Sequence, residues 1–398
     1  MLFLFVLLLS LTGMLKAQVT TAGMSGKVMA DEESVIGATV VAVHEPSGTS
    51  YGTVTNVDGR FSLQGMRSGG PYKVTVSYIG YQTAIYTDIQ LQLGETYSLN
   101  VTLHEASELL GEITITASKS KFSAEKTGAT TNISSEQLTT LPSINRSISD
   151  FTRISPYASG NSFGGRDGRS NTFTVDGANL NNNFGLSSGL PGGGNPISLD
   201  AIDEVQVVIA PYDVRQANFI GAGINAITKS GTNAYRGSAY MYFNNEVMRG
   251  NKIGDTDFGV RAEESKTVYG ATFGGPIIKD KLFFFANVEY EKSPQQVITW
   301  RAAKEGETPN NSTISRTTEA DLAEFSQILK DKYGYNTGSF TDFPADITNL
   351  KLLGRIDWNI NQGNKLSVRY NFTNNKTWEA PNGSSGNTGY RLAYNRVS

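Results

Sequence analysis

The sequence has 398 residues, a formal net charge of −3 and a pI of about 5.6. This length gives room for two or three domains of ~100–200 residues each. Only 18% of the residues are charged, whereas aromatic residues reach 10% and glycine occurs 42 times. Few charges with many aromatics and turn-forming residues are typical of a β-rich chain. The acidic pI and the lack of a basic stripe argue against a nucleic-acid partner.

Cysteine is absent, which excludes a disulfide scaffold, thiolate metal sites and a cysteine nucleophile. The two histidines, His44 and His104, are far apart in the sequence. A multi-histidine metal site or a Ser-His-Asp triad would need one of them, and neither has a candidate partner nearby. We therefore expect no catalytic residue, no metal and no cofactor.

An apolar run begins at Leu2 and continues to Leu15, followed by Lys16-Ala17-Gln18. The run is too short to span a bilayer comfortably, because a spanning helix needs ~20 residues. A small residue at Ala17 suits a cleavage site. Residues 1–17 are predicted to be a secretory signal peptide, although no basic residue precedes the apolar run.

Apolar residues alternate in short runs between residues 22 and 104. Turn signals such as Asp58-Gly59 separate the runs, and strands at this spacing are typical of a β-sandwich. Several pieces of the region resemble the carboxypeptidase-regulatory-like domain, which implies a transthyretin-like sandwich without catalytic residues. The pieces are Gly26-Lys27-Val28, Gly37-Ala38-Thr39-Val40, Thr55-Asn56-Val57-Asp58-Gly59-Arg60-Phe61 and Gly80-Tyr81.

Residues 105–118 are predicted to be a linker that ends in an extended segment. Residues 112–117 alternate apolar and β-branched polar side chains without proline, so their backbone could add to the sheet edge of another protein. The alternative is the first strand of the next domain. The segment resembles a TonB box, the peptide through which an energy-coupling protein pulls on outer-membrane transporters. Its residues are Glu112, Ile113, Thr114, Ile115, Thr116 and Ala117.

Residues 119–230 combine a short helix, glycine-rich loops and strands. Ile144, Ile148, Phe151 and Ile154 predict an amphipathic helix that ends before Pro156. A glycine and arginine loop, a Val-Asp-Gly turn, an Asp-Glu-Val strand and a Gly-x-Ile-Asn-x-Ile-Thr-Lys-Ser-Gly exit follow in that order. This order resembles the plug domain of TonB-dependent receptors of the Oar-like group. The predicted plug-loop residues are Gly164, Gly165, Arg166, Gly168, Arg169, Asp176 and Gly177.

Arg166 and Arg169 are candidates for a latch between the plug and its barrel. A guanidinium can hold a carboxylate with two parallel hydrogen bonds. Asp357 and Glu289, on the polar faces of later strands, are the predicted partners. The alternative is that both arginines are solvated loop residues.

Three short motifs offer an enzyme as an alternative. Ser118-x-x-Lys121, Ser143-x-Asn145 and Lys229-Ser230-Gly231 occur in the order of a serine β-lactamase. The first motif follows an alternating strand rather than opening a helix, and the segment from Lys121 to Ser143 is too short for the intervening helical subdomain. The motif order therefore does not favour catalysis.

Several segments within residues 231–398 alternate apolar and polar residues with a two-residue period. Each alternation runs for nine or ten residues, the length of a tilted transmembrane strand. Charged residues lie on one side and apolar residues on the other, with short and long connections in alternation. A soluble β-sandwich is the alternative. Large outer-membrane transporters close with about 22 strands, so we expect the chain to be the N-terminal part of a longer protein. The predicted strands are 235–243, 266–274, 282–290, 351–360 and 365–373, and a helix is predicted at 320–332.

The predicted fold is mainly β: a transthyretin-like sandwich (22–104), an α+β plug (119–230) and the first strands of a transmembrane β-barrel (231–398). The resemblance to Oar-like TonB-dependent receptors implies capture of an external ligand and its import, with no bond broken. It also implies the TonB energy-coupling complex, outer-membrane lipid and an unknown external ligand as partners. The expected location is the outer membrane of a Gram-negative bacterium. The alternative is a cell-surface adhesin or matrix protein built from β-sandwich domains.

Overall fold

The structure is a computed structural model of the chain. It describes residues 19–30, 32–105, 113–116, 129–143, 146–181, 195–211, 216, 219–257, 264–296, 301–309, 314–338, 344–361, 363–379 and 394–397. The predicted signal peptide, Glu112, Ala117 and Ile144 lie outside the described residues. The fold is mainly β, as predicted.

The chain divides into two compact units. One comprises Met1–Gly237, Thr272–Asn287 and Leu353–Tyr370, and the other comprises Ser238–Ala271, Val288–Leu352 and Asn371–Ser398.

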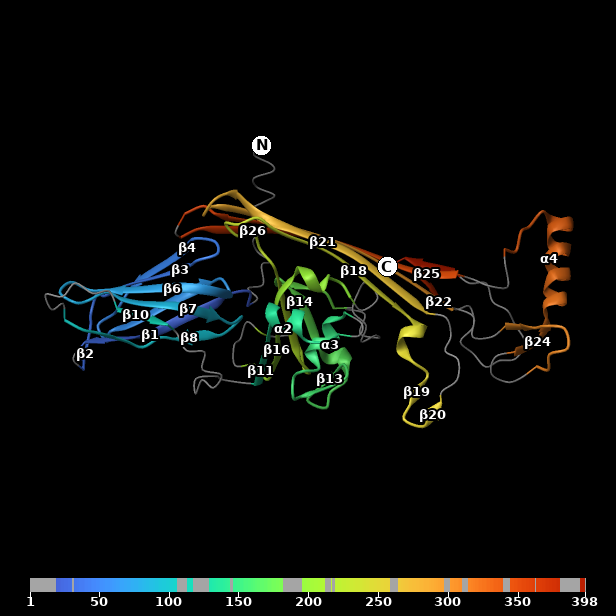
Figure 1. Cartoon of the computed structure of the whole chain (residues 1–398), viewed down its shortest axis with the longest axis horizontal. Coiled ribbons are helices and arrows are strands. Elements are labelled where there is room, and N and C mark those ends of the chain that lie inside the picture. Colours follow the sequence, from blue (N-terminus) through green and yellow to red (C-terminus); the bar gives the residue numbers. More distant parts are fainter. Residues whose placement is uncertain are drawn as a thin grey trace. The chain divides into compact units, whose positions relative to one another are not determined.

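Two sheets form the N-terminal sandwich (Figure 1). In the first sheet, β1 pairs antiparallel with β2 and β5 and parallel with β8 and β9. The second sheet has the order β10-β7-β6-β3-β4. Their facing sides bury residues such as Met24, Val28 and Tyr72, each 0% exposed. The bounds are β1 Ala22–Ala30, β2 Glu33–Ser34, β3 Thr39–His44, β4 Thr49–Val54, β5 Arg60–Met66, β6 Gly69–Ser77, β7 Ala84–Leu91, β8 Thr96–Ser98, β9 Val101–Leu103 and β10 Ile113–Thr116.

The plug region has its own sheet, of order β11-β16-β17-β14-β15. The strand β16 lies inside the sheet and is buried almost throughout, with β11 and β17 antiparallel to it. The bounds are β11 Ala129–Ser134, α2 Ser135–Thr140, α3 Ile148–Thr152, β12 Ala158–Ser159, β13 Ser162–Phe163, η2 Gly168–Ser170, β14 Thr172–Val175, β15 Ala178–Asn179, η3 Leu199–Ala201, β16 Ile202–Ile209 and β17 Gly223–Thr228.

The helices of this region differ from the prediction. The helix α3 ends at Thr152, so Ile148 and Phe151 are buried but Ile154 is 45% exposed. The predicted stripe therefore extended too far, because the chain turns at Arg153. The helix α2 was missed, although Ser134 and Gln137 form the capping box that marks such a start.

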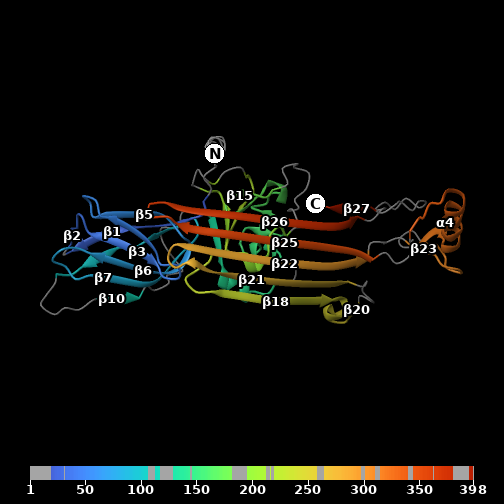
Figure 2. The same ribbon diagram turned by 90° about the horizontal axis from the view of Figure 1, so that it is seen from above.

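The long strands of the C-terminal region form one sheet of order β18-β21-β22-β25-β26-β27 (Figure 2). The strand β22 has 15 residues and β25 has 16, longer than the nine or ten predicted. Both strands extend into segments that the sequence predicted to be connections. The bounds are β18 Arg236–Asn245, η4 Glu246–Arg249, β19 Lys252–Ile253, β20 Thr256–Asp257, β21 Ser265–Ile278, β22 Leu282–Gln296, β23 Arg301–Ala303, β24 Ile314–Thr318, α4 Glu319–Tyr333, β25 Pro344–Asn359, β26 Lys365–Glu379 and β27 Tyr394–Val397.

The strand β25 is inverted relative to a strand of a water-soluble protein. Arg355 and Asp357 are 9% and 5% exposed, whereas Ile356 and Trp358 are 46% and 45% exposed. Exposing the apolar face and burying the charged one is unfavourable in water but favourable against hydrocarbon. The soluble β-sandwich alternative does not fit this region.

The predicted helix at 320–332 is present as α4. It begins at a capping box formed by Thr318 and Asp321 and ends at Gly334, which has a left-handed φ of 64°. Glycine is favoured at this position because it has no Cβ to strain. Among the helices that the structure describes, none is long and apolar enough to cross a membrane.

Candidate functional site

The candidate site is a buried cluster of charges that begins at a hairpin tip of the plug region. Val175 pairs with Ala178, which leaves Asp176 and Gly177 as a two-residue loop between β14 and β15. Both have positive φ, 48° and 85°. An Asp-Gly pair suits this turn because both residues tolerate the left-handed region. The turn places the Asp176 carboxylate beside the end of β17.

Thr228, the last residue of β17, binds both oxygens of Asp176. Its backbone N–H donates to Oδ1 at 3.0 Å, and its hydroxyl donates to Oδ2 at 2.6 Å. These bonds fix the hairpin tip against the strand that leads out of the plug.

Arg355 of β25 approaches the same two residues. Its Nη1 donates to the Thr228 carbonyl oxygen and lies 3.2 Å from the Thr228 hydroxyl. The same nitrogen is 3.9 Å from Oδ1 of Asp176. Its Nε donates to Oδ2 of Asp357 at 2.7 Å. Arg355 therefore links the plug hairpin to a carboxylate of the long sheet.

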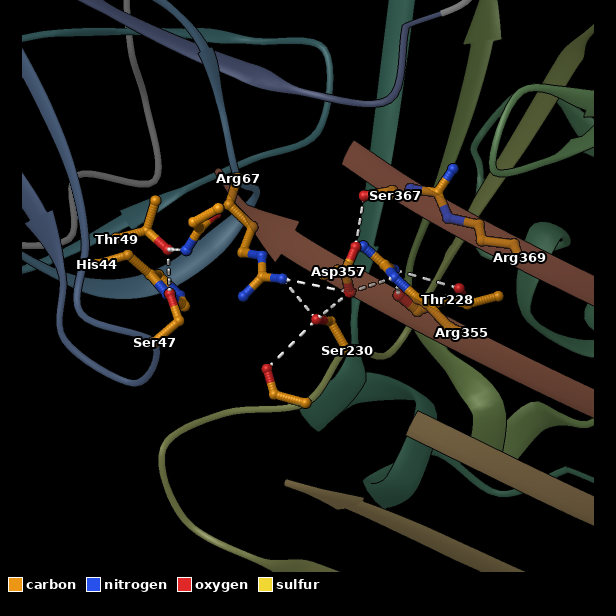
Figure 3. Close-up of polar contacts among 12 residues, drawn as sticks. His44, Ser47, Thr49, Arg67, Thr228, Ser230, Arg355, Asp357, Ser367 and Arg369 are labelled. Atoms are coloured by element: carbon orange, nitrogen blue, oxygen red, sulfur yellow. Dashed lines mark hydrogen bonds and ion pairs between the residues drawn. The ribbon is translucent and has the colours of Figure 1, made fainter. Parts of the chain in front are cut away.

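Asp357 lies at the centre of the remaining contacts (Figure 3). It accepts hydrogen bonds from the hydroxyls of Ser230 and Ser367. Arg67, from the loop between β5 and β6 of the sandwich, donates to Ser230, and its Nη2 is 3.4 Å from Oδ2 of Asp357. A third arginine, Arg369 of β26, places Nε 3.4 Å from Oδ2 of Asp176.

The cluster thus joins three arginines and two aspartates from the sandwich, the plug and two strands of the sheet. The Asp176, Asp357 and Arg355 side chains are 6%, 7% and 9% exposed. Removing one partner from such a buried pair leaves an uncompensated charge, which is strongly destabilising. The arrangement can hold the plug in one position and release it when force separates the charges.

A second polar contact joins the sandwich to the plug at β16. The N–H of Leu93 donates to both carboxylate oxygens of Glu204 at 3.1 Å, and the Gln206 amide donates to the Leu93 carbonyl oxygen. The pKa of Glu204 is raised to about 8, chiefly by burial, with the Asp203 and Glu95 charges adding to the rise and the Leu93 N–H opposing it. Neutral Glu204 is therefore the form favoured in this contact at pH 7.

Sandwich residues near the end of the long strands add further contacts. Thr49 accepts a hydrogen bond of 2.9 Å from the Asn359 amide. The Lys365 ammonium lies 3.3 Å from the centre of the Tyr51 ring, a cation–π geometry.

His44 forms a hydrogen bond of 2.7 Å with Ser47. Burial, with a smaller contribution from the Arg67 charge, lowers the pKa of His44 to about 3. His44 is thus neutral in its hydrogen bond with Ser47, whereas His104 is exposed.

Only Asp176 and Gly177 of the predicted plug-loop residues belong to the cluster. Arg169 pairs with Asp167 at 2.9 Å, and both side chains are more than half exposed. Arg166 is exposed, while Gly164 and Gly165 form a turn with φ of 57° and 75°. Gly168 opens the short helix η2, which Asp167 caps.

The predicted partners of the two arginines are paired differently. Asp357 is bound by Arg67 and Arg355 rather than by the plug loop. Glu289 accepts from Lys351 at 2.8 Å and from the Tyr240 hydroxyl at 2.8 Å. The predicted latch pairing was therefore wrong. Arg169 instead pairs with the neighbouring Asp167 carboxylate, and Arg166 is exposed.

The sequence reading missed Arg67, Thr228, Ser230, Arg355 and Arg369 as site residues. Arg355 and Arg369 lie in the predicted strands 351–360 and 365–373, whose charged residues fall on one side, and a charged residue on the inner face of a membrane sheet is itself a signal. Arg67 offered no signal, since it follows an ordinary strand.

Part of the predicted TonB box is described. Ile113–Thr116 form β10, which pairs in parallel with β7 of the sandwich. In the part of the chain that the structure describes, no group of His, Cys, Asp and Glu residues could hold a metal ion.

Comparisons with known families match both ends of the chain. Residues 23–104 match the carboxypeptidase regulatory-like domain, and residues 227–397 match an outer membrane beta barrel domain. The second match indicates a location in the outer membrane of a Gram-negative bacterium.

A curated relative is the TonB-dependent transporter Oar of Myxococcus xanthus, which is 25% identical over 344 residues. The alignment covers 81% of this chain but 30% of the relative, so the chain spans about a third of the length of the protein that it matches. This similarity agrees with the predicted resemblance.

Solved structures with similarity to the chain include a siderophore receptor and an outer membrane transporter. The siderophore receptor PirA from Acinetobacter baumannii is 20% identical with a TM-score of 0.40, covering 62% of this chain and 31% of the receptor. The outer membrane transporter YddB from Escherichia coli is 14% identical with a TM-score of 0.41, covering 64% and 34%.

Proposed function

We propose that the chain belongs to a TonB-dependent outer-membrane receptor that captures an external ligand and imports it through a plugged β-barrel. The similarity to a TonB-dependent transporter supports this function, and so does the match to an outer-membrane barrel domain. The protein is a binding and transport protein rather than an enzyme. Its energy source is the TonB complex, which pulls on residues 112–117.

One observation carries the proposal: a plug hairpin is tied by buried charges to the polar face of an inverted strand. Asp176 at the hairpin tip faces Arg355, and the neighbours of Arg355 on β25 expose apolar side chains. A strand with lipid on one side and an ion-paired plug on the other is what a gated barrel needs. An adhesin built from β-sandwiches has no use for either feature.

The proposed gating has a direct test, because the chain has no cysteine of its own. Thr174→Cys places a near-isosteric thiol in β14, where Thr174 is 6% exposed. In cells that carry the full-length protein, a small maleimide should label this thiol faster when TonB and the proton gradient are present. Thr53→Cys on the sandwich serves as the control and should be labelled equally in all cells.

Equal labelling of Thr174→Cys with and without TonB would contradict energised plug movement. Recovery of the full-length protein in a soluble fraction would contradict the membrane location.

The coupling role of residues 112–117 has its own test. Ile113→Pro and Ile115→Pro each remove a backbone donor and disturb an extended segment. We expect loss of binding to the purified C-terminal domain of TonB, with unchanged amounts of protein in the membrane. Full binding by both proline variants would reject this segment as the coupling peptide.

A further inference from the structure

The segment proposed to bind TonB is already a strand of the sandwich. Ile113 pairs with Ala84, and the parallel register continues to Thr116 opposite Thr87. In the order β10-β7-β6-β3-β4, β10 is an outer strand of this sheet. The backbone that a coupling protein needs is therefore engaged within the same chain.

The register of this pairing is specific. Ala84 and Tyr86 are 5% and 8% exposed and belong to the sandwich core. Their register partners are Ile113 and Ile115. Directly paired residues share a face of a sheet, so the two apolar positions of the segment match the core positions of β7. A slip by one residue would place threonine positions there instead.

The pairing is also short enough to open. It covers four residues, and parallel pairing is slightly less stable per residue than antiparallel pairing. The neighbouring strands β6 and β7 instead pair antiparallel, from Gly69 opposite Leu91 to Val76 opposite Ala84. A competing strand can therefore displace β10 without disturbing the rest of the sandwich.

We propose that the sandwich stores the coupling strand and that TonB binds residues 113–116 only after they leave β7. The inference rests on the proposed function. A protein that adds a strand takes its specificity from alternate side chains, and the alternate isoleucine positions are in register with the sandwich core. Pairing with β7 and recognition by TonB therefore exclude each other. With storage, the apparent affinity for TonB equals the intrinsic affinity multiplied by the fraction of molecules in which the strand is free.

A cross-link between the two strands tests storage directly. Thr87→Cys and Thr116→Cys are register partners, and residues 1–398 contain no cysteine of their own. In the full-length protein, a short thiol-bridging reagent should join them. The cross-linked protein should bind the purified C-terminal domain of TonB at least about tenfold more weakly than before treatment. Thr53→Cys with Thr116→Cys is the matched control, because Thr53 lies in β4 at the opposite edge of the sheet, and it should not cross-link.

The outcomes separate this inference from the function on which it rests. Absence of the Thr87–Thr116 cross-link overturns the pairing. A cross-linked protein that binds TonB as well as the untreated one also overturns storage, because the strand would then be presented rather than withheld. A synthetic peptide of residues 108–120 reports on the function: if it fails to bind TonB, the coupling role is rejected regardless of the cross-link.

Discussion

Asp176→Asn isolates the contribution of charge at the hairpin tip. Asparagine has nearly the same shape and tolerates the positive φ of 48° that this position requires. Its amide oxygen can still accept the hydrogen bond from the Thr228 N–H. The substitution therefore keeps the turn and removes the negative charge that Arg355 and Arg369 face at 3.9 and 3.4 Å.

The magnitude follows from burial and from the partners that remain. Breaking a buried ion pair costs ~3–5 kcal/mol when the other charge is left alone. Arg355 keeps Asp357 at 2.7 Å, so we expect a smaller loss of about 2–3 kcal/mol in plug anchoring. Since 1.4 kcal/mol is a factor of ten, the released state should become roughly 30- to 140-fold more populated.

Two assays report this change. In planar bilayers, the full-length Asp176→Asn protein should open far more often than the parent. Cells that carry it should also admit more vancomycin, which is too large for ordinary porins. Asp167→Asn is the matched control, because Asp167 pairs with Arg169 at an exposed site, where ion pairs contribute little. If Asp176→Asn behaves like Asp167→Asn in both assays, the buried cluster does not anchor the plug.

Three further changes address the sandwich and its contact with the plug. Arg67→Ala should broaden the distance distribution between spin labels on the sandwich and the plug, because the guanidinium that donates to Ser230 is lost. An unchanged distance distribution would show that the arginine does not hold the two together. The pKa of Glu204 is raised to about 8, so docking of the sandwich to the plug favours the protonated form. Docking should be strongest below the ordinary pKa near 4.5 and should weaken as the pH rises through 8. Glu204→Gln should remove this pH dependence, and a retained dependence would assign it to another group. Gly26→Ala would place a Cβ 1.8 Å from the Leu99 carbonyl oxygen and should destabilise the sandwich by about 2 kcal/mol or more in thermal unfolding, whereas Gly52→Ala, with 4.0 Å to the nearest atom, should change it little.

Local patterns predicted the strands and turns well. The alternation around Arg355 and Asp357 correctly separated an apolar face from a charged one, and Gly334 ends α4 where the helix was predicted to stop. The Asp176-Gly177 turn was also predictable, because its chemistry depends only on two adjacent residues. Each of these features is decided within a few residues of chain.

Partner choice was not predictable in the same way. Arg355 binds Thr228 across 127 positions of sequence, and Arg369 reaches the Asp176 carbonyl oxygen across 193. The sequence showed which residues carry charge on an inner face but not which plug carboxylate would lie opposite. Asp357 and Glu289 were predicted as partners of the two loop arginines from their charge and strand face, whereas Asp167, two residues from Arg169, was the nearer acceptor.

The distance along the chain between Asp176 and its arginines has a consequence for biogenesis. The plug sequence is synthesised and exported before the residues that neutralise its hairpin tip, since Arg355 and Arg369 lie in β25 and β26. Until those strands are in place, burying Asp176 would leave its charge uncompensated. The plug hairpin can therefore reach its final position only together with these strands, which makes assembly of the sheet a condition for seating the plug.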